Sequence, residues 1–313
     1  MSLLKLQPAF KDYIWGGYRL ADEYGKADKG TFLAETWELS CYPDSPSIIR
    51  NGSYANRTLN EYIEENGKQV LGKNCEVFEN FPILIKLIDA RDALSIQVHP
   101  DNGYAGAHGG RSGKTEMWYI LDAAEDSFIY YGFRDRISRD EFRKRIEENT
   151  LTEVLNKVRV HSGDVFFIEA GTLHSIGKGI LTAEIQQNSD LTYRIYDYGR
   201  MGADGKPREL HIDDALEVTR LEKAVNHKHE LPRLGSCEYF IVDRLDTDEK
   251  IEFTVDSGSF VHILFLTGEG KIASGDCELG FKKGDSFFIP ADSGKVVITG
   301  KCEAIKTFEP DRV

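Results

Sequence analysis

Short apolar runs separated by turn residues make up most of the chain. Examples are residues 81–88, 117–121 and 165–168, each followed or preceded by segments that contain Gly or Asp. Apolar runs of this kind, bounded by turn residues, are typical of buried strands in barrels and sandwiches. The pattern therefore predicts a mainly β fold.

Three segments have helical spacing of their apolar positions instead. Residues 57–72 have this spacing and end at a glycine, and residues 211–224 have it as well. Residues 138–157 open with Ser138-Arg-Asp-Glu141, which is the pattern of a capping box. The sequence thus predicts three helices added to the β fold.

One strand pattern occurs twice. The segment Gly163-Asp-Val-Phe-Phe-Ile168 aligns without gaps to Gly284-Asp-Ser-Phe-Phe-Ile289, and each copy follows another apolar strand. This repeat predicts two related barrels, with a boundary between residues 1–230 and 231–313. The position of His174 in the first copy is taken by Lys295 in the second. We therefore expect the second barrel to be degenerate, metal-free and structural.

Composition and charge exclude several classes of partner. The 313 residues carry a net charge of −13 without any block of basic residues, so nucleic acid and anionic membranes are poor partners. No apolar stretch approaches the roughly 20 residues that span a bilayer. The five cysteines are scattered and form no CxxC pair, which indicates free thiols and a cytoplasmic location. Any anion site must be built from a few local Lys, Arg or backbone N–H groups.

Four side chains in three segments form a candidate metal site. Gln97 and His99 lie two residues apart in a β-type context, so both side chains leave the same face of a strand. Glu116 opens one apolar run, and His174 follows another. An amide, two imidazoles and a carboxylate suit zinc or another divalent ion, with a position left open for substrate.

The motifs resemble the cupin superfamily and, within it, the short bacterial form of the type I mannose-6-phosphate isomerases. Gly163, Gly171 and His174 match the second cupin motif, although Glu169 stands where proline is usual. The more specific matches are the segments Tyr13-Ile-Trp15-Gly-Gly, Phe81-Pro-Ile-Leu-Ile-Lys86, Ser95-Ile-Gln-Val-His-Pro-Asp101, Lys114-Thr-Glu-Met117 and Tyr193-Arg-Ile-Tyr-Asp197. The acidic residue that longer members carry before the tryptophan is Ile14 here.

The resemblance implies two jelly-roll β-barrels with a few helices and a role for each motif residue. It assigns one zinc ion per chain to Gln97, His99, Glu116 and His174. It implies a catalytic role for Arg194, Lys114 and Glu184, and a role in binding substrate for Lys86, Ser95 and Trp15, the first two at the phosphate. The segment 109–113 is expected to form a mobile loop ahead of Lys114.

The activity implied is the interconversion of mannose 6-phosphate and fructose 6-phosphate through a cis-enediol. A divalent cation and an arginine would stabilise the negative charge that develops on O1 or O2. Glu184, Lys114 or a metal-bound water could carry the proton, and the sequence does not choose among them. The expected partner is a small sugar phosphate, and the protein is expected to be a monomer or a weak homo-oligomer.

Each assignment has a plainer alternative. Arg194 could pair with Asp190 or Asp197, Lys86 could extend outward from its strand, and Trp15 could be a core residue. Two other functions are also compatible with a cupin fold, namely an Fe(II) oxygenase and a sugar-binding protein without catalytic activity.

Overall fold

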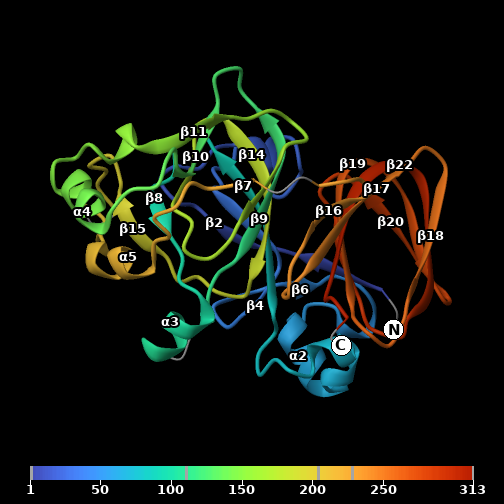
Figure 1. The fold of residues 1–313 in the computed structure, drawn as a ribbon. Helices are drawn as coiled ribbons and strands as arrows, with labels where there is room; N and C mark the ends of the chain where they lie inside the picture. The colour runs from blue at the N-terminus through green and yellow to red at the C-terminus, as the bar shows by residue number, and fades with distance from the viewer. Residues whose placement is uncertain (1–2, 110–111, 203–204, 227–228, 312–313) are drawn as a thin grey trace.

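The computed structural model describes residues 3–109, 112–202, 205–226 and 229–311. It is mainly β, as the apolar pattern predicts, and the segments with the candidate metal ligands lie in the part coloured from teal to yellow in Figure 1. The expected loop at 109–113 falls partly outside the described residues, because 110 and 111 are not among them. None of the helices described is both long and apolar enough to cross a membrane.

Two antiparallel sheets carry the motif residues. The first sheet has the order β12 (Val165–Ile168), β9 (Glu116–Ala123), β14 (Ile180–Gln187), β7 (Ile83–Ala90), β3 (Glu35–Leu39) and β2 (Ala9–Lys11). The second has the order β11 (Leu155–Arg159), β10 (Phe128–Phe133), β13 (His174–Ile176), β8 (Ile96–Val98) and β15 (Tyr193–Tyr196).

These two sheets pack against each other. One buried cluster joins Ile88 and Trp118 of the six-stranded sheet to Ile129 and Ile176 of the five-stranded sheet. Strands with one face packed on a partner sheet bury every second side chain there, which makes the space between the sheets an interior. The candidate site must lie on these two facing surfaces.

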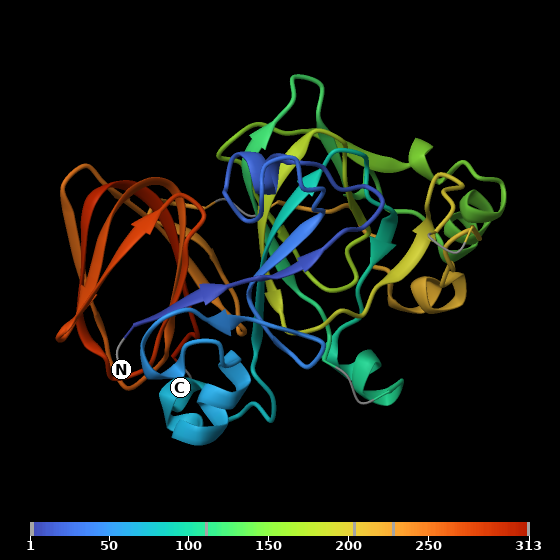
Figure 2. The ribbon, with the colours of Figure 1, turned by 180° about the vertical axis from the view of Figure 1, so that it is seen from behind.

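A nine-stranded sheet forms most of the remaining β structure, and a two-stranded sheet completes it. The C-terminal strands of the nine-stranded sheet are coloured orange and red in Figures 1 and 2, and its N-terminal strands are blue. Its main path is β16 (Arg233–Ser236), β17 (Ile241–Thr247), β22 (Gly294–Phe308), β19 (Val261–Ser274), β21 (Ser286–Ile289), β1 (Leu4–Gln7) and β6 (Ile48–Ile49). In addition, β18 (Lys250–Val255) pairs with β22 and β20 (Cys277–Lys282) pairs with β19.

The N-terminal strand links this third sheet to the rest of the chain. Leu4 is the register partner of Phe288, and Leu6 is the partner of Ile49 on its other side. The blue strand that enters the red sheet in Figure 2 follows this path. The division expected at residue 230 is therefore crossed by β1 and β6, which belong to the sheet built mostly from residues 233–308.

The predicted helices form, but all three are shorter than expected. Helix α2 (Leu59–Asn66) begins with a capping box at Thr58 and ends at Gly67, whose φ of 82° separates it from a short 3-10 segment, η2 (Lys68–Leu71). Helix α4 (Arg139–Glu147) ends well before residue 157, and α5 (Ile212–Val218) ends before residue 224. The reason in α4 is Asn149, which adopts φ 58° and breaks the helical backbone.

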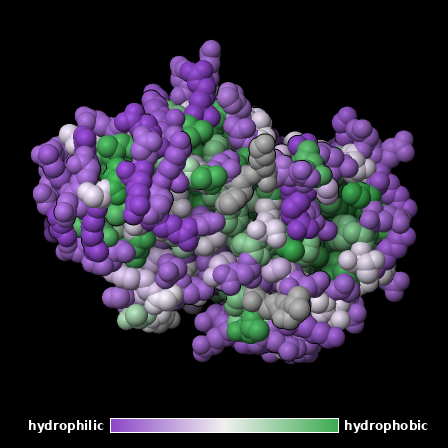
Figure 3. All heavy atoms as spheres, in the orientation of Figure 1, coloured by the Kyte–Doolittle hydropathy of each residue, from purple (hydrophilic) through white to green (hydrophobic). Residues whose placement is uncertain are grey.

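The remaining elements are short. They are α1 (Arg19–Asp22), α3 (Asn102–Ala107), η1 (Gly52–Tyr54), η3 (Lys73–Cys75), η4 (Leu151–Glu153), β4 (Cys41–Tyr42) and β5 (Ser45–Pro46). The sequence patterns did not predict α3. Its N-cap is Asp101, whose carboxylate accepts the backbone N–H of Tyr104 at 2.8 Å. On the face seen in Figure 3, hydrophilic residues dominate and apolar ones are scattered among them.

Candidate metal centre

Strand register places three motif residues side by side on the five-stranded sheet. Gln97 of β8 is the partner of His174 on β13 and of Arg194 on β15. Directly paired residues share one face of a sheet, so all three side chains leave the same surface. His99 follows two residues after Gln97, just past the end of β8. The pairing of β8 with β13 and β15 therefore supports the expectation that the side chains of Gln97 and His99 leave the same face of the sheet.

The six-stranded sheet carries a row of charged residues on its inner face. Glu184 of β14 pairs in register with Trp118 of β9 and with Lys86 of β7, which in turn pairs with Trp37 of β3. Glu116 lies two residues before Trp118 and so shares its face. The carboxylates and the ammonium of this row all lie in an almost fully buried setting.

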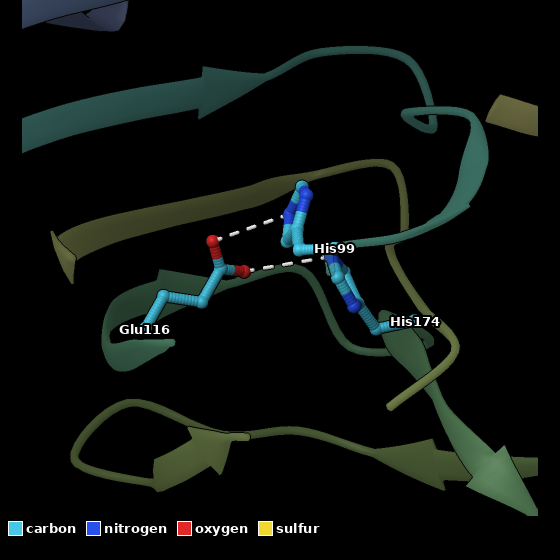
Figure 4. A group of neighbouring side chains, drawn as sticks. All are labelled: His99, Glu116 and His174. Carbon is cyan, nitrogen blue, oxygen red and sulfur yellow. Dashed lines mark ion pairs between the residues drawn. The ribbon is translucent and has the colours of Figure 1, made fainter. Parts of the chain in front are cut away.

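Three of the four expected metal ligands meet in one cluster. The Nε2 atoms of His99 and His174 each lie 3.5 Å from a different carboxylate oxygen of Glu116. Figure 4 shows the two imidazole rings, which come from separate segments of the chain, both directed at that carboxylate. The candidate ligand atoms of the three residues all lie within 4.8 Å of one another. This spacing is compatible with a single metal ion among them.

Backbone carbonyls orient both imidazole rings. Nδ1 of His99 lies 2.9 Å from the Leu191 carbonyl oxygen, and Nδ1 of His174 lies 2.8 Å from that of Thr172. Because a carbonyl only accepts hydrogen bonds, each Nδ1 carries the proton and each Nε2 keeps a lone pair toward Glu116. This is the arrangement by which proteins usually hold a metal-binding histidine.

Burial keeps the two rings neutral. Burial lowers the pKa of His99 to about 4, and the neighbouring Lys114 ammonium adds to the shift. Burial also lowers the pKa of His174. For Glu116, burial alone would raise the pKa, but Lys114 and His99 outweigh it and hold the carboxyl well below its ordinary value. The site thus offers two neutral imidazoles and one carboxylate.

The setting of the Glu116 carboxylate is that of a ligand to a cation. Both of its oxygens are buried, and neither accepts a hydrogen bond of regular geometry from the described residues. Its closest positive neighbour is Lys114, whose Nζ lies 2.6 Å from Oε2 and 3.2 Å from His99 Nε2. An ionised carboxylate faced by two imidazole lone pairs fits a divalent ion such as zinc.

Gln97 is placed to complete the ligand set. Its side-chain Nε2 lies 3.5 Å from His174 Nε2, and its Oε1 accepts a hydrogen bond from Ser95 Oγ at 3.1 Å. Turning the amide by 180° would direct Oε1 at the cluster, and the Ser95 hydroxyl could then accept from Nε2. Ser95 therefore orients the Gln97 amide in either case.

Glu184 and Lys86 form a buried ionic pair beside the cluster. Lys86 Nζ lies 3.0 Å from Glu184 Oε1 and 3.7 Å from Glu35 Oε2. Glu184 Oε2 accepts the indole N–H of Trp118 at 2.9 Å, and Lys114 Nζ lies 3.6 Å from Oε1. Burial and Glu116 favour the neutral form of Glu184, yet Lys114 and Lys86 prevail and lower its pKa. Lys86 therefore points inward, not out to solvent.

Within the described part of the chain, Arg194 forms no ion pair with Asp197, which was one of its two expected alternatives. Its Nη1 donates to the Glu209 carbonyl at 3.1 Å, and its buried Nε has no hydrogen-bond partner among the described residues. Asp197 is instead held by Arg208, with Nε to Oδ2 at 2.6 Å, and by Arg200. The structure thus leaves part of the guanidinium available on the face shared with Gln97.

The structure shows the surroundings of two residues that were expected to bind substrate, Trp15 and Ser95. Trp15 is 4% exposed and belongs to the apolar cluster between the two sheets, where it contacts Tyr13 at a ring distance of 5.7 Å. Ser95 lies on the five-stranded side, whereas Lys86 lies on the six-stranded side, and no contact joins the two. The described contacts thus connect Ser95 to Gln97 and Lys86 to Glu184.

Sequence reasoning missed Glu35 and Trp37. Glu35 Oε2 accepts the indole N–H of Trp37 at 2.7 Å and lies within ion-pair distance of Lys86. Both residues lie on one face of β3, which is buried along its whole length. The segment Ala34-Glu-Thr-Trp-Glu-Leu39 is half polar, so its sequence carries no clear signal that Glu35 is buried and requires a partner.

Family models match two long segments of the chain. Residues 3–125 match the model for the catalytic domain of type I phosphomannose isomerase, and residues 233–309 match the model for the cupin domain of mannose-6-phosphate isomerase. Together these segments include three of the four candidate metal ligands, and His174 lies between them.

Individual relatives extend the similarity over nearly the whole chain. The mannose-6-phosphate isomerase ManA of Bacillus subtilis (strain 168) is 37% identical over 312 residues, which cover 96% of this chain and 97% of the relative. A mannose-6-phosphate isomerase of Streptococcus mutans is 35% identical over 92% of each chain.

Solved structures agree with the sequence relatives. The crystal structure of a mannose 6-phosphate isomerase from Bacillus subtilis superposes with a TM-score of 0.89 at 35% identity, covering 98% of this chain and 99% of that one. A zinc-bound mannose 6-phosphate isomerase has the same fold, with a TM-score of 0.78 at 19% identity over 99% of this chain and 100% of that one. The chain therefore belongs to the type I mannose-6-phosphate isomerase family.

Proposed function

We propose that the protein interconverts D-mannose 6-phosphate and D-fructose 6-phosphate in a zinc-dependent reaction that passes through a cis-enediol. Relatives of this activity cover nearly the whole chain. The single observation that carries the proposal is the buried cluster of His99, Glu116 and His174, with an ionised carboxylate that lacks regular hydrogen bonds.

One zinc ion per chain would be held by Gln97, His99, Glu116 and His174. The donor set supports this, since it combines two neutral imidazoles, a carboxylate and an amide that is hydrogen-bonded to Ser95. When bound, the ion supplies positive charge beside the sugar oxygens O1 and O2, where the reaction develops negative charge.

Arg194 is proposed as the second source of positive charge. It is the register partner of Gln97, and its Nε has no partner among the described residues. A guanidinium keeps its proton at any physiological pH and cannot act as the base here. Its proposed role is to donate hydrogen bonds to O1 or O2 as the C–H bond breaks.

Glu184 is proposed as the base. It is ionised because Lys114 and Lys86 lower its pKa, and it is buried beside the metal centre. The carboxylate accepts the proton from C2 of mannose 6-phosphate and returns it to C1, while the hydroxyl proton moves between O1 and O2. Lys114 Nζ lies 3.6 Å from Glu184 Oε1 and 2.6 Å from Glu116 Oε2. Its ammonium would offset part of the negative charge of these two carboxylates and donate hydrogen bonds to the sugar oxygens.

Lys86, Ser95 and Trp15 are proposed to bind substrate. Lys86 would supply part of the positive charge at the phosphate, and Trp15, which packs in the cluster between the sheets, would supply an apolar wall. Ser95 would contact the substrate beside Gln97, whose amide it also holds.

The same reasoning extends to the second copy of the repeat. We infer that the chain forms two cupin-like barrels, that they correspond to residues 1–230 and 231–313, and that the second holds no metal. The support is its filled apolar core, which includes Ile263, Phe265 and Phe287, and the exposed side chain of Lys295, which pairs with Glu252 at 2.7 Å. Five free cysteines support a cytoplasmic location, and we infer a monomer or a weak homo-oligomer.

The activity is tested by incubating the zinc-loaded protein with mannose 6-phosphate in an assay coupled to fructose 6-phosphate. The expected result is steady product formation that the substitution Glu116→Gln abolishes. Product formed at the same rate by the Glu116→Gln protein, or none formed by the unaltered zinc-loaded protein, would refute the proposal.

A further inference from the structure

The charge around Lys86 is unfavourable for a phosphate dianion. Three buried carboxylates (Glu35, Glu116 and Glu184) surround two ammonium groups (Lys86 and Lys114), which leaves a net charge of −1 before any metal binds. Lys86 lies within 4.0 Å of two of these carboxylates. Its positive charge is thus largely used inside the protein, and a further cation is needed where the phosphate group binds.

Lys11 provides a cation at the edge of the same surface. It lies on β2, and its register partner is Glu35 on β3, so its side chain leaves the face that carries Trp37 and Lys86. Its Nζ lies 4.5 Å from the centroid of the Trp37 ring, and Lys86 Nζ lies 5.3 Å from the same centroid. The indole of Trp37 therefore lies beside two ammonium groups, that of Lys86 in the interior and that of Lys11 at the edge of the sheet.

Lys11 differs from Lys86 in having no acidic partner. Its Nζ donates to Ser45 Oγ, and no carboxylate lies within 4.0 Å of it among the described residues. The side chain is half-buried, so the ammonium is held in place and yet reachable from solvent. The Ser45 hydroxyl and the Trp37 ring use only part of the ammonium's capacity to donate hydrogen bonds, so it can still donate to an anion.

Carboxylates lie next to Lys11 in the sheet and in the chain. Glu35, its register partner on β3, is buried, and Asp12 follows Lys11 directly. Carboxylates at this edge of the sheet repel a phosphate dianion unless a cation compensates. Lys11, which precedes Asp12 in the chain, is in position to do so.

We propose that Lys11 is a specificity-determining residue that binds the phosphate group of the substrate at the edge of the sheet. The inference rests on the proposed function. The phosphate is attached to C6, at the opposite end of the sugar from C1 and C2. The strand order agrees with this polarity, because β9 carries Glu116 near one edge of the sheet and β2 carries Lys11 at the other.

The test compares Lys11→Met, which removes the charge and keeps the apolar stem over Trp37, with Lys11→Arg, which keeps the charge. The matched control is Lys157→Met, because Lys157 Nζ also lies over an aromatic ring, 3.9 Å from the centroid of Phe128, on the edge strand β11, which β10 separates from β13 and His174. For Lys11→Met the KM for mannose 6-phosphate is expected to rise roughly 10- to 100-fold, in keeping with the loss of a hydrogen bond to a charged group. The kcat is expected to change less than about threefold, since the group contacts substrate and transition state alike.

Binding of a substrate analogue that cannot isomerise separates this inference from the proposed function. We would titrate zinc-loaded protein with glucitol 6-phosphate and with glucitol. In Lys11→Met the Kd for glucitol 6-phosphate is expected to rise by the same factor as the KM for mannose 6-phosphate, while the Kd for glucitol stays unchanged. In Lys11→Arg, which keeps the charge, the Kd for glucitol 6-phosphate is expected to stay close to that of the unaltered protein.

Unchanged affinity of Lys11→Met for glucitol 6-phosphate would overturn the inference, and so would equal losses for both probes. A fall in kcat at constant KM would overturn it as well. If the unaltered protein binds glucitol 6-phosphate through Lys11 but forms no fructose 6-phosphate, the inference stands and the proposed isomerase activity fails.

Discussion

The two copies of the Gly-Asp-x-Phe-Phe-Ile strand place different residues at the same register. On β12 the motif isoleucine, Ile168, pairs with Glu116, whereas on β21 the corresponding Ile289 pairs with Val261. Two residues earlier, Phe166 pairs with Trp118 in the first copy and Phe287 pairs with Ile263 in the second. The backbone arrangement is shared, and the chemistry depends on which side chain occupies the facing strand.

The difference has an energetic side. Residues of the second copy such as Val261, Ile263 and Phe287 belong to one apolar cluster, and burying each such side chain stabilises the fold by about 1.5–3 kcal/mol. In the first copy the same space holds Glu116 and Glu184, and removing carboxylates from water is costly unless cations meet them. A site that binds metal and substrate therefore forgoes apolar packing, while the second copy keeps it.

The largest expected effect comes from removing a metal ligand of the first copy. His99→Ala should lower isomerase activity at least roughly 1000-fold and reduce the zinc retained per chain, because an imidazole that contacts Glu116 is lost. Activity and zinc content are measured on the same preparations. The control is His161→Ala, an exposed histidine, which should leave both unchanged. Full zinc content together with full activity in His99→Ala would contradict the assigned site.

Removing the proposed base should separate chemistry from metal binding. Glu184→Gln is expected to lower kcat roughly 100- to 1000-fold, since an amide cannot accept the proton, while zinc content stays the same. Steady-state kinetics and metal analysis test this expectation. A kcat close to that of the unaltered protein would assign proton transfer to another group, such as Lys114.

Acidification should destabilise the metal-free protein through its neutral histidines. The pKa of His99 is about 4 in the folded protein and near 6.5 when unfolded, so the unfolded state binds more protons between these values. The free energy of unfolding contributed by this group is complete above pH 6.5 and is lost as the pH falls toward 4, by about 3 kcal/mol.

Urea unfolding at several pH values checks this slope, with His99→Asn as the comparison. His262 of the second copy, buried with a pKa of about 3, should add a similar dependence that persists in His99→Asn. A free energy of unfolding that is flat from pH 6.5 to 4 would show that neither histidine is held neutral.

Arg194→Met should act on turnover more than on affinity. The loss of a cation that stabilises developing negative charge is expected to lower kcat on the order of 100-fold, with a smaller change in KM. Arg159→Met, which affects an exposed arginine paired with Asp126, is the control. A large rise in KM at constant kcat would instead indicate that Arg194 binds the ground state of the substrate.

The smallest expected effect is at the second copy of the site. Lys295→His restores the histidine of the motif, yet it should add no zinc and no activity, because this side chain is exposed and Val261 stands where Glu116 would be. Metal analysis of the variant should give the same zinc content as the unaltered protein. A second zinc ion per chain would show that the two copies differ less than their registers indicate.

The β fold and the three candidate metal ligands that lie together in the structure could be predicted from the sequence, because they follow from strand patterns and from the repeat. The common face of Gln97 and His99 follows from residue spacing alone, and so does the position of Glu116 at the start of β9. The pairing of β1 with β21 could not be predicted, since it joins residues about 280 positions apart, such as Leu6 and Ser286, without a local signal.

Other features of the site were also beyond the sequence patterns. The carbonyls of Leu191 and Thr172 orient the histidines, and every residue has a carbonyl, so residue type carries no information about them. The ends of α4 and α5 were misjudged because helical spacing of apolar residues continues after the backbone has turned at Asn149 or Thr219.

The most direct test of the account is a zinc titration of chelator-treated protein in which bound metal and isomerase activity are followed together. Activity should be lost on chelation and should return in proportion to bound zinc, reaching its limit at one ion per chain. Full turnover of mannose 6-phosphate by protein that holds no metal would contradict the central claim that His99, Glu116 and His174 form a catalytic metal site.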